Sequence, residues 1–159
     1  MEYNMQLNNK DLYCLAVKVL LVDDQDRLLI IKDIYDDGWD IPGGRLRPMD
    51  FNVSFEDVVT RKMKEELGDL VKYQLGEPVV YFRHEREEVL PSGENESIRI
   101  FAIGYQAKYV GGEINLGEYL KEYKWVPLAT FVPEEYLVGG WLNGVKEFQE
   151  KYNKNIKLN

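Results

Sequence analysis

The pattern of apolar and polar positions along the chain predicts strands linked by short turns. Residues 12–22 are mainly apolar and often β-branched, which favours a buried strand. The acidic stretch at 23–26 predicts a turn, and residues 27–32 predict the partner strand of a hairpin. Apolar runs at 78–84 and 97–110 predict two more strands.

Charged and polar segments separate the later elements. Residues 85–96 are rich in charge and contain a proline and a glycine, so we expect an exposed loop there. A further strand is expected at 124–127 and a closing helix at about 140–152. The polar tail at 153–159 is expected to fray.

The segment 55–67 predicts an amphipathic helix. Ser54 precedes it as an N-cap, Asp57 follows three residues later in a capping-box arrangement, and Gly68 marks its end. Because its apolar residues recur at three- and four-residue steps, we expect one face of the helix to pack on a sheet. The residues of this face are Phe55, Val58, Val59, Met63 and Leu67.

Length and composition limit the classes of protein. A chain of 159 residues with 45% hydrophobic and 13% aromatic residues suits a single globular domain over 1–159. A net charge of −8 argues against a nucleic acid polymer as partner, since binding to nucleic acid depends on clustered Lys and Arg. No signal sequence or long apolar stretch is present, so we expect no membrane contact and a cytoplasmic location.

The chain has one cysteine, Cys14, and one histidine, His84. A single cysteine excludes an intramolecular disulfide and a multi-cysteine zinc site, and Cys14 is expected to be a buried thiol. A single histidine makes a Ser-His-Asp triad or a multi-histidine metal site implausible. Carboxylates are therefore expected to carry any catalysis.

A turn rich in glycine precedes the helix, and two glutamates end it. Gly43 and Gly44 after Pro42 let the backbone come close to a bound ion or phosphate. Glu65 and Glu66 are adjacent, and Mg²⁺ typically takes one or two carboxylates together with water and phosphate oxygens. Each glutamate also has a basic residue four positions earlier, so a solvated charged face would explain the pair on its own.

This stretch resembles the signature of the Nudix hydrolases, G-x5-E-x7-R-E-U-x-E-E-x-G-U, where U is a bulky apolar residue. The matching positions are Gly44, Arg61, Met63, Glu65, Glu66 and Gly68, and Trp39 to Gly44 fit the preceding W-x-x-P-G-G. The resemblance extends over roughly residues 12 to 152. It implies an α/β fold, a Nudix-type α/β/α sandwich with a mixed β-sheet.

The sequence departs from the signature at three places. Lys62 stands where the first helical glutamate is expected, and we expect its ammonium to pair with Glu66 or with a substrate phosphate. Asp50 follows Gly44 after five residues in place of glutamate, and about three extra residues then precede Arg61, so that counting back from Arg61 reaches Val53 instead. The third departure is Asp69, which replaces an apolar residue.

The resemblance implies a metal site formed by Gly44, Glu65 and Glu66, with Mg²⁺ as the ion and Mn²⁺ as an alternative. With Lys62 in the helix, the general base is expected on a later segment, with Glu118 as first choice and Glu122 as second. The alternative interpretation is that both are acidic residues of a solvated loop without a catalytic role.

The remaining candidates concern the substrate and the loop. Arg61 is also a candidate catalytic residue, and we expect it to hold the signature loop in place by pairing with a carboxylate or carbonyl. Arg45 and Arg47 are expected to contact phosphate, although surface solubility explains them equally well. Tyr35 and Tyr119 are expected to stack on a base or sugar.

Two function classes stay open at this point. The first is a metal-dependent pyrophosphohydrolase that cleaves a small nucleoside diphosphate linked to another moiety, such as a nucleotide sugar. The second is a catalytically impaired Nudix-fold module with a nucleotide-binding or regulatory role, which Lys62 keeps open. A homodimer is compatible with either class, and the sequence does not specify the leaving group.

Overall fold

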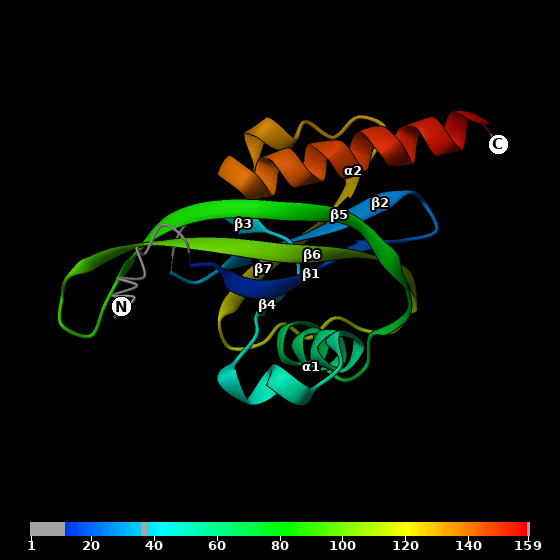
Figure 1. Ribbon diagram of the computed structural model, residues 1–159. Coiled ribbons are helices and arrows are strands. Elements are labelled where there is room, and N and C mark those ends of the chain that lie inside the picture. Colours follow the sequence, from blue (N-terminus) through cyan, green and yellow to red (C-terminus); the bar gives the residue numbers. More distant parts are fainter. Residues whose placement is uncertain (1–11, 36–37, 159) are drawn as a thin grey trace, which may run out of the picture.

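The computed structural model describes residues 12–35 and 38–158, and within them seven strands form one sheet that lies between two helices (Figure 1). The strands are β1 (Cys14–Val22), β2 (Arg27–Asp33), β3 (Trp39–Asp40), β4 (Gly43–Arg45), β5 (Lys72–Val89), β6 (Asn95–Gly111) and β7 (Leu120–Pro127). The helices are α1 (Phe55–Leu67) and α2 (Gly139–Leu158), with short 3-10 turns η2 (Pro48–Asn52) and η3 (Pro133–Glu135). The sheet order is β3-β2-β1-β6-β5, with β4 paired to β1 and β7 paired to β2.

Strand β1 lies in the middle of the sheet and makes it mixed. It pairs in parallel with β6, from Cys14 opposite Ile100 to Val22 opposite Lys108, whereas the other strand pairs are antiparallel. A strand buried on both faces reads as a continuous apolar run. This explains why residues 12–22 show little alternation, and the α/β sandwich with a mixed sheet is confirmed.

Two separate cores lie on the two faces of the sheet. On one face, the odd-numbered positions of β1 from 17 to 21 pack with the apolar face of α1. On the other face, Ala16 and Leu20 pack with α2 through Trp141, Val145 and Phe148. The α1 residues in the first core are Val58, Val59, Met63 and Leu67. Each helix is therefore fixed by burial of one apolar stripe. Four of the five predicted residues of the α1 face are buried, whereas Phe55, in the first turn, is 36% exposed and lies outside this core.

The predicted ends of α1 are also observed. Ser54 accepts a hydrogen bond through its side chain from the Asp57 N–H at 3.1 Å, which satisfies a free donor of the first turn. Gly68 ends the helix with φ of 88°, and its N–H donates to the Lys64 carbonyl at 3.0 Å. Since the end of α1 carries both glutamates, these caps determine where the glutamates lie.

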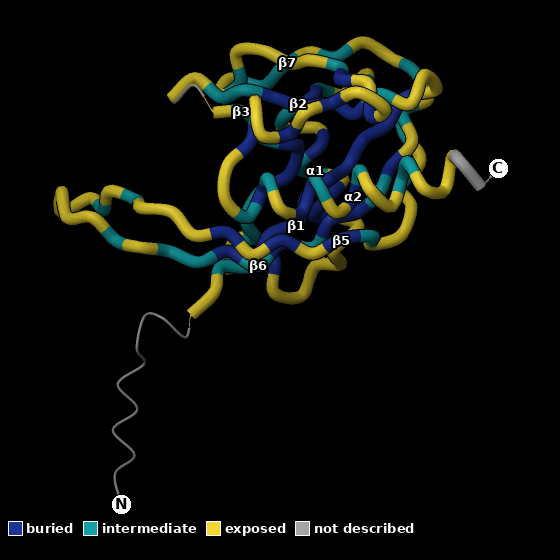
Figure 2. The backbone as a smooth tube through the Cα atoms, turned by 90° about the horizontal axis from the view of Figure 1, so that it is seen from above, coloured by how far each residue is buried: buried dark blue, intermediate teal, exposed yellow. Residues whose placement is uncertain are grey.

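The prediction of an exposed loop at residues 85–96 is wrong. Strands β5 and β6 continue through this region as a long hairpin that extends away from the body of the protein (Figure 2). Only the tip is a turn, where the Leu90 N–H donates to the Glu94 carbonyl at 2.8 Å. The charged residues form pairs on the hairpin, such as Arg86 with Glu88 at 2.7 Å. A ribbon exposed on both faces needs no apolar alternation, so its sequence resembled that of a loop.

Two further boundaries differ from the expectation. Helix α2 continues to Leu158, so residues 153–158 are helical and not frayed; Asn153 donates from its side chain to the Leu128 carbonyl at 3.1 Å, which holds this part of the helix. Residue 159 lies outside the described residues. Strand β7 begins at Leu120, before residue 124, and therefore includes Glu122. No helix in the described ranges combines the length and apolar character that a membrane crossing requires.

Candidate active site

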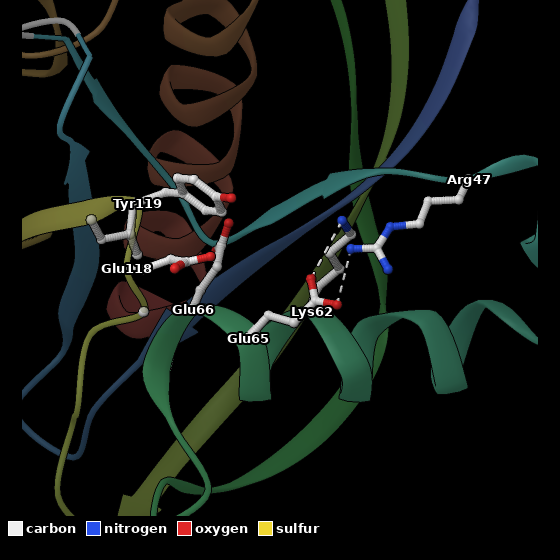
Figure 3. Close-up of a pocket in the computed structure, with 8 residues that line it drawn as sticks. Arg47, Lys62, Glu65, Glu66, Glu118 and Tyr119 are labelled. Carbon is white, nitrogen blue, oxygen red and sulfur yellow. Dashed lines mark hydrogen bonds and ion pairs between the residues drawn. The ribbon is translucent and has the colours of Figure 1, made fainter.

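A cavity of about 530 Å³ opens beside the C-terminal half of α1 (Figure 3). It lies within the volume range of small-molecule sites, about 300 to 1,000 Å³. Its lining comes from α1, from the loop after β4 and from the segment that leads into β7. The lining residues are Arg47, Lys62, Glu65, Glu66, Gly117, Glu118, Tyr119 and Leu120.

The segment before β7 is bound to the end of α1. The N–H of Gly117 donates to the Glu66 carbonyl at 3.0 Å, and the N–H of Asn115 donates to the Leu67 carbonyl at 2.9 Å. A Cβ at Gly117 would lie 2.1 Å from the carbonyl oxygen of Glu65, so only glycine allows this approach. These bonds satisfy free carbonyls of the helix end and bring Glu118 to the pocket.

The turn at Pro42, Gly43 and Gly44 positions the carboxylate of Glu66. Gly43 has φ of 136°, and a Cβ there would lie 2.1 Å from the Val17 carbonyl oxygen, so the turn requires glycine. The Gly43 N–H donates to Oε2 of Glu66 at 2.9 Å. The Pro42 carbonyl in turn accepts from the Val19 N–H at 2.8 Å, which fixes the turn to β1.

Burial raises the pKa of Glu66 from its ordinary value of 4.5 to about 7. The positive charge of Lys18, the hydrogen bond from Gly43 and the positive charge of Lys62 oppose this rise, and the negative charge of Asp40 adds to it. The nearby positive charge is therefore too small to offset the desolvation of the carboxylate. Binding of a further cation or of a proton would therefore stabilise the Glu66 side chain in this position.

A buried lysine supports the turn from the α2 side of the sheet. The side chain of Lys18 is only 6% exposed, and its Nζ donates to Oδ2 of Asp40 at 2.7 Å and to the Ile41 carbonyl at 3.2 Å. Its ammonium also lies 4.6 Å from the centre of the Trp141 ring, a favourable cation–π distance. Lys18 therefore connects the residues just before the glycine turn to the N-terminal part of α2.

His84 belongs to the same cluster and lies outside the pocket. Its ring stacks on Trp141 with the ring centres 4.6 Å apart, and its Nδ1 accepts from the Gly140 N–H at 3.1 Å. Burial lowers the pKa of His84, which favours the neutral ring that can accept this bond. The histidine thus packs at the start of α2 and does not line this pocket.

Glu65 lies among three cations. Its Oε1 is 3.1 Å from the Arg47 guanidinium and 3.5 Å from Nε of Arg61, and its Oε2 is 3.7 Å from Nζ of Lys62. The expected pairing of Lys62 with Glu66 is replaced by this contact with Glu65. A divalent ion at Glu65 would have to compete with these cations.

Arg61 holds the loop before α1 through Asp50. Its guanidinium forms two bonds with the carboxylate, of which the Nη2–Oδ2 bond measures 2.8 Å, and the Arg47 N–H donates to the same carboxylate at 2.7 Å. The side chain of Asp50 is 1% exposed, and these donors hold its pKa well below the usual range. Asp50, and not Val53, thus meets Arg61.

The extra residues of this loop explain that result. They lie in η2 and just after it, where Phe51 is 89% exposed and Val53 is 39% exposed. The insertion therefore bulges into solvent and leaves the contact between Asp50 and Arg61 intact. Sequence reasoning did not assign a role to Asp50, although its distance from Gly44 was a usable signal.

Five predicted site residues are not among those that line the pocket: Gly44, Arg61, Arg45, Glu122 and Tyr35. Arg45 pairs with Glu88 of the hairpin at 3.0 Å, because its side chain leaves β4 toward β5. Glu122 lies in β7 opposite Lys32, since β7 starts earlier than expected. Tyr35 stacks on Tyr119 with ring centres 6.0 Å apart and so extends the wall of the pocket.

The pocket has an acidic end and a basic end. Figure 3 shows Glu66, Glu118 and Tyr119 at one end and Glu65, Lys62 and Arg47 at the other. A hydrogen bond to Glu118 raises the pKa of the Tyr119 phenol. Carboxylates and basic side chains are thus separated within one cavity.

The acidic end fits one divalent ion. Within residues 12–35 and 38–158, no three His, Cys, Asp or Glu side chains gather closely enough to hold a metal. Mg²⁺ in proteins often has only one or two carboxylate ligands, with water and phosphate oxygens completing the shell. Glu66, whose carboxylate is desolvated, offers one such ligand at the acidic end of the cavity.

The sequence model of the NUDIX domain matches residues 12–140, most of the described chain. The chain belongs to the NUDIX domain family. The family consists of hydrolases that act on phosphoric anhydride bonds and generally use a divalent metal ion. No curated protein matches the sequence.

Solved structures show the same NUDIX fold. A MutT protein from Methanosarcina mazei Go1 is 22% identical, with a TM-score of 0.67 over 91% of this chain and 96% of that chain. A UDP-X diphosphatase is 14% identical, with a TM-score of 0.63 over 91% and 64% of the two chains. An ADP-ribose pyrophosphatase from Streptococcus suis 89-1591 is 16% identical, with a TM-score of 0.62 over 89% and 92%.

Proposed function

We propose that this NUDIX protein is a Mg²⁺-dependent pyrophosphohydrolase, with Mn²⁺ as an alternative ion, that cleaves a small nucleoside diphosphate linked to another moiety. The observation that carries the proposal is the cavity with one acidic and one basic end. A diphosphate bound to a cation carries both kinds of charge and complements both ends. The fold neighbours include proteins named for UDP-X and ADP-ribose, which supports a nucleotide derivative as the substrate class.

We assign the ion to Glu66, which has the buried carboxylate and a fixed orientation through the Gly43 N–H. When bound, such an ion neutralises charge on the phosphate oxygens and increases the acidity of a water molecule. Glu65 and the Gly44 carbonyl remain candidate ligands, although Glu65 must first leave its cationic partners. Arg61 then acts indirectly, by holding the loop that carries Arg47.

Glu118 is the proposed general base. It lines the cavity on the same side as Glu66, whereas Glu122 lies in β7 away from the lining. Its carboxylate would accept the proton of the attacking water, while Arg47 holds a phosphate oxygen at the opposite end. Tyr119 and Tyr35 form an aromatic wall next to Glu118, and this wall is suited to stacking on a nucleobase.

The second candidate is a NUDIX-fold module that binds nucleotides without hydrolysis. The contact of Lys62 with Glu65 favours it, because a fixed ammonium occupies the region where the resemblance places a carboxylate. The two candidates share the pocket and differ in turnover.

The test uses purified protein with Mg²⁺ or Mn²⁺ and a panel of nucleotide sugars, dinucleotides and nucleoside triphosphates, with detection of released phosphate products. Glu118→Gln is expected to lower kcat by roughly 10²- to 10⁴-fold with metal affinity nearly unchanged. Glu122→Gln is the matched control and should keep wild-type turnover. Absence of turnover with every substrate, together with nucleotide binding, would establish the second candidate.

A further inference from the structure

The basic end of the pocket is preorganised by contacts that do not involve a metal ion. Arg47 is held through its own N–H, which donates to Asp50 at 2.7 Å, and Asp50 is clamped by Arg61. The Arg47 side chain is 47% exposed, so its guanidinium stays open to the cavity. A cation with a fixed backbone and an open head group is suited to bind an anion.

Lys62 lies deeper in the same end. Its side chain is 13% exposed and passes over the glycine turn, where a Cβ at Gly44 would lie 3.2 Å from Nζ, 3.3 Å from Cε and 3.4 Å from Cδ. The absence of a side chain at Gly44 therefore makes room for the lysine stem. The ion pair of its ammonium with Glu65 is long, 3.7 Å, and an ammonium has three donors. Lys62 can therefore bind a further acceptor.

Glu65 is the internal counter-ion of this end. It pairs with Arg47 and Lys62 and is 37% exposed, so its side chain can turn toward solvent when another anion arrives. A phosphate group provides several oxygens in place of the two of a carboxylate and can contact both cations. Exchange of Glu65 for phosphate therefore keeps the cations neutralised.

We propose that Lys62 and Arg47 form a phosphate-binding site that holds a diphosphate group without a divalent ion, with Glu65 as its internal competitor. This inference deepens the proposed function and rests on the same pocket. The basic end would bind the diphosphate, and a metal ion at Glu66 would be needed only for the chemical step. Substrate affinity then depends little on metal, whereas turnover depends on it strongly.

The experiment is calorimetric titration with methylenediphosphonate, a diphosphate that cannot be hydrolysed at its bridge, in buffer containing EDTA. Wild-type protein should bind, and Lys62→Met should weaken binding by about 10-fold or more, since hydrogen bonds to charged groups are among the strong ones. Methionine preserves the packing of the stem on Gly44. Lys64→Met makes the same change at an exposed position of α1 outside the pocket lining and should bind as wild type.

Glu65→Gln gives a result of opposite sign. Removal of the competitor should strengthen binding in EDTA by several-fold, whereas a purely structural ion-pair cluster would loosen and bind more weakly. Arg47→Gln, at an exposed side chain, should weaken binding as Lys62→Met does. No binding by wild type in EDTA, equal binding by Lys62→Met, or weaker binding by Glu65→Gln would each overturn the proposal.

These outcomes are separate from those of the hydrolase test. Diphosphonate binding in EDTA without turnover on any substrate would support this site and reject the hydrolase. Turnover with Mg²⁺ but no binding in EDTA would keep the hydrolase and reject this site.

Discussion

The carboxylate of Glu66 should make the metal-free protein less stable as pH rises. Burial raises its pKa in the folded protein to about 7 from an ordinary 4.5, so between these values the folded state binds more protons than the unfolded state. The stabilisation that comes from proton binding at Glu66 is fully present below pH 4.5 and is lost as the pH rises through 7. At 1.36 kcal/mol per pKa unit, the loss amounts to about 3 kcal/mol.

Glu66→Gln removes this titration and keeps an oxygen acceptor for the Gly43 N–H. In EDTA, we expect the variant to equal wild type near pH 4.5 and to exceed its free energy of unfolding by about 3 kcal/mol at pH 8. Urea unfolding followed by circular dichroism at intervals from pH 4.5 to 8 measures this difference. Mg²⁺ should recover part of the loss in wild type and none in the variant, because the ion stabilises the folded state that binds it.

Glu65→Gln is the matched control for that measurement. Glu65 lies among Arg47, Arg61 and Lys62, so its removal should bring no gain in stability at pH 8. A difference between wild type and Glu66→Gln that stays constant from pH 4.5 to 8 would refute the electrostatic account of the buried carboxylate.

Two further variants test the supports of the site. Gly43→Ala should lower the free energy of unfolding by about 1 to 3 kcal/mol or more, because alanine is strained at φ of 136° and its Cβ would lie 2.1 Å from the Val17 carbonyl oxygen. The control is Gly93→Ala, also at positive φ but in open space. It should lower the stability measured by thermal unfolding less and keep wild-type turnover. Arg61→Gln should lower kcat/KM by about 10-fold or more, the scale of a lost charge-assisted hydrogen bond, because Asp50 then no longer fixes the loop. Full kcat/KM in this variant would contradict a positioning role.

The sequence predicted the central features because they depend on local patterns. The apolar face of α1 and its caps at Ser54 and Gly68 follow from residue spacing and from the chemistry of helix ends. The apolar run of β1 reflects burial on both faces. Such features require no knowledge of distant partners.

The parts that the sequence did not predict depend on contacts between distant residues. The pairing of Glu65 with Arg47 joins α1 to a loop 18 positions earlier, and nothing local distinguishes it from a solvated charge. Lys18 is a single lysine in an apolar strand, and its partner Asp40 follows 22 positions later. The pairing of Arg45 with Glu88 could not be predicted either, because Glu88 lies on a hairpin whose charge pattern resembled that of a loop.

The parallel pairing of β1 with β6 has a consequence for how the chain folds. Leu15 finds its neighbour Phe101 only after most of the polypeptide has been made, whereas β1 meets β2 nearby in the sequence, at Val22 opposite Leu28. Contacts between such distant segments must overcome the entropy of closing a long loop, which slows folding. During synthesis, the apolar surfaces of β1 and β2 therefore stay exposed until β6 arrives, and this interval is when the nascent chain is most prone to aggregate.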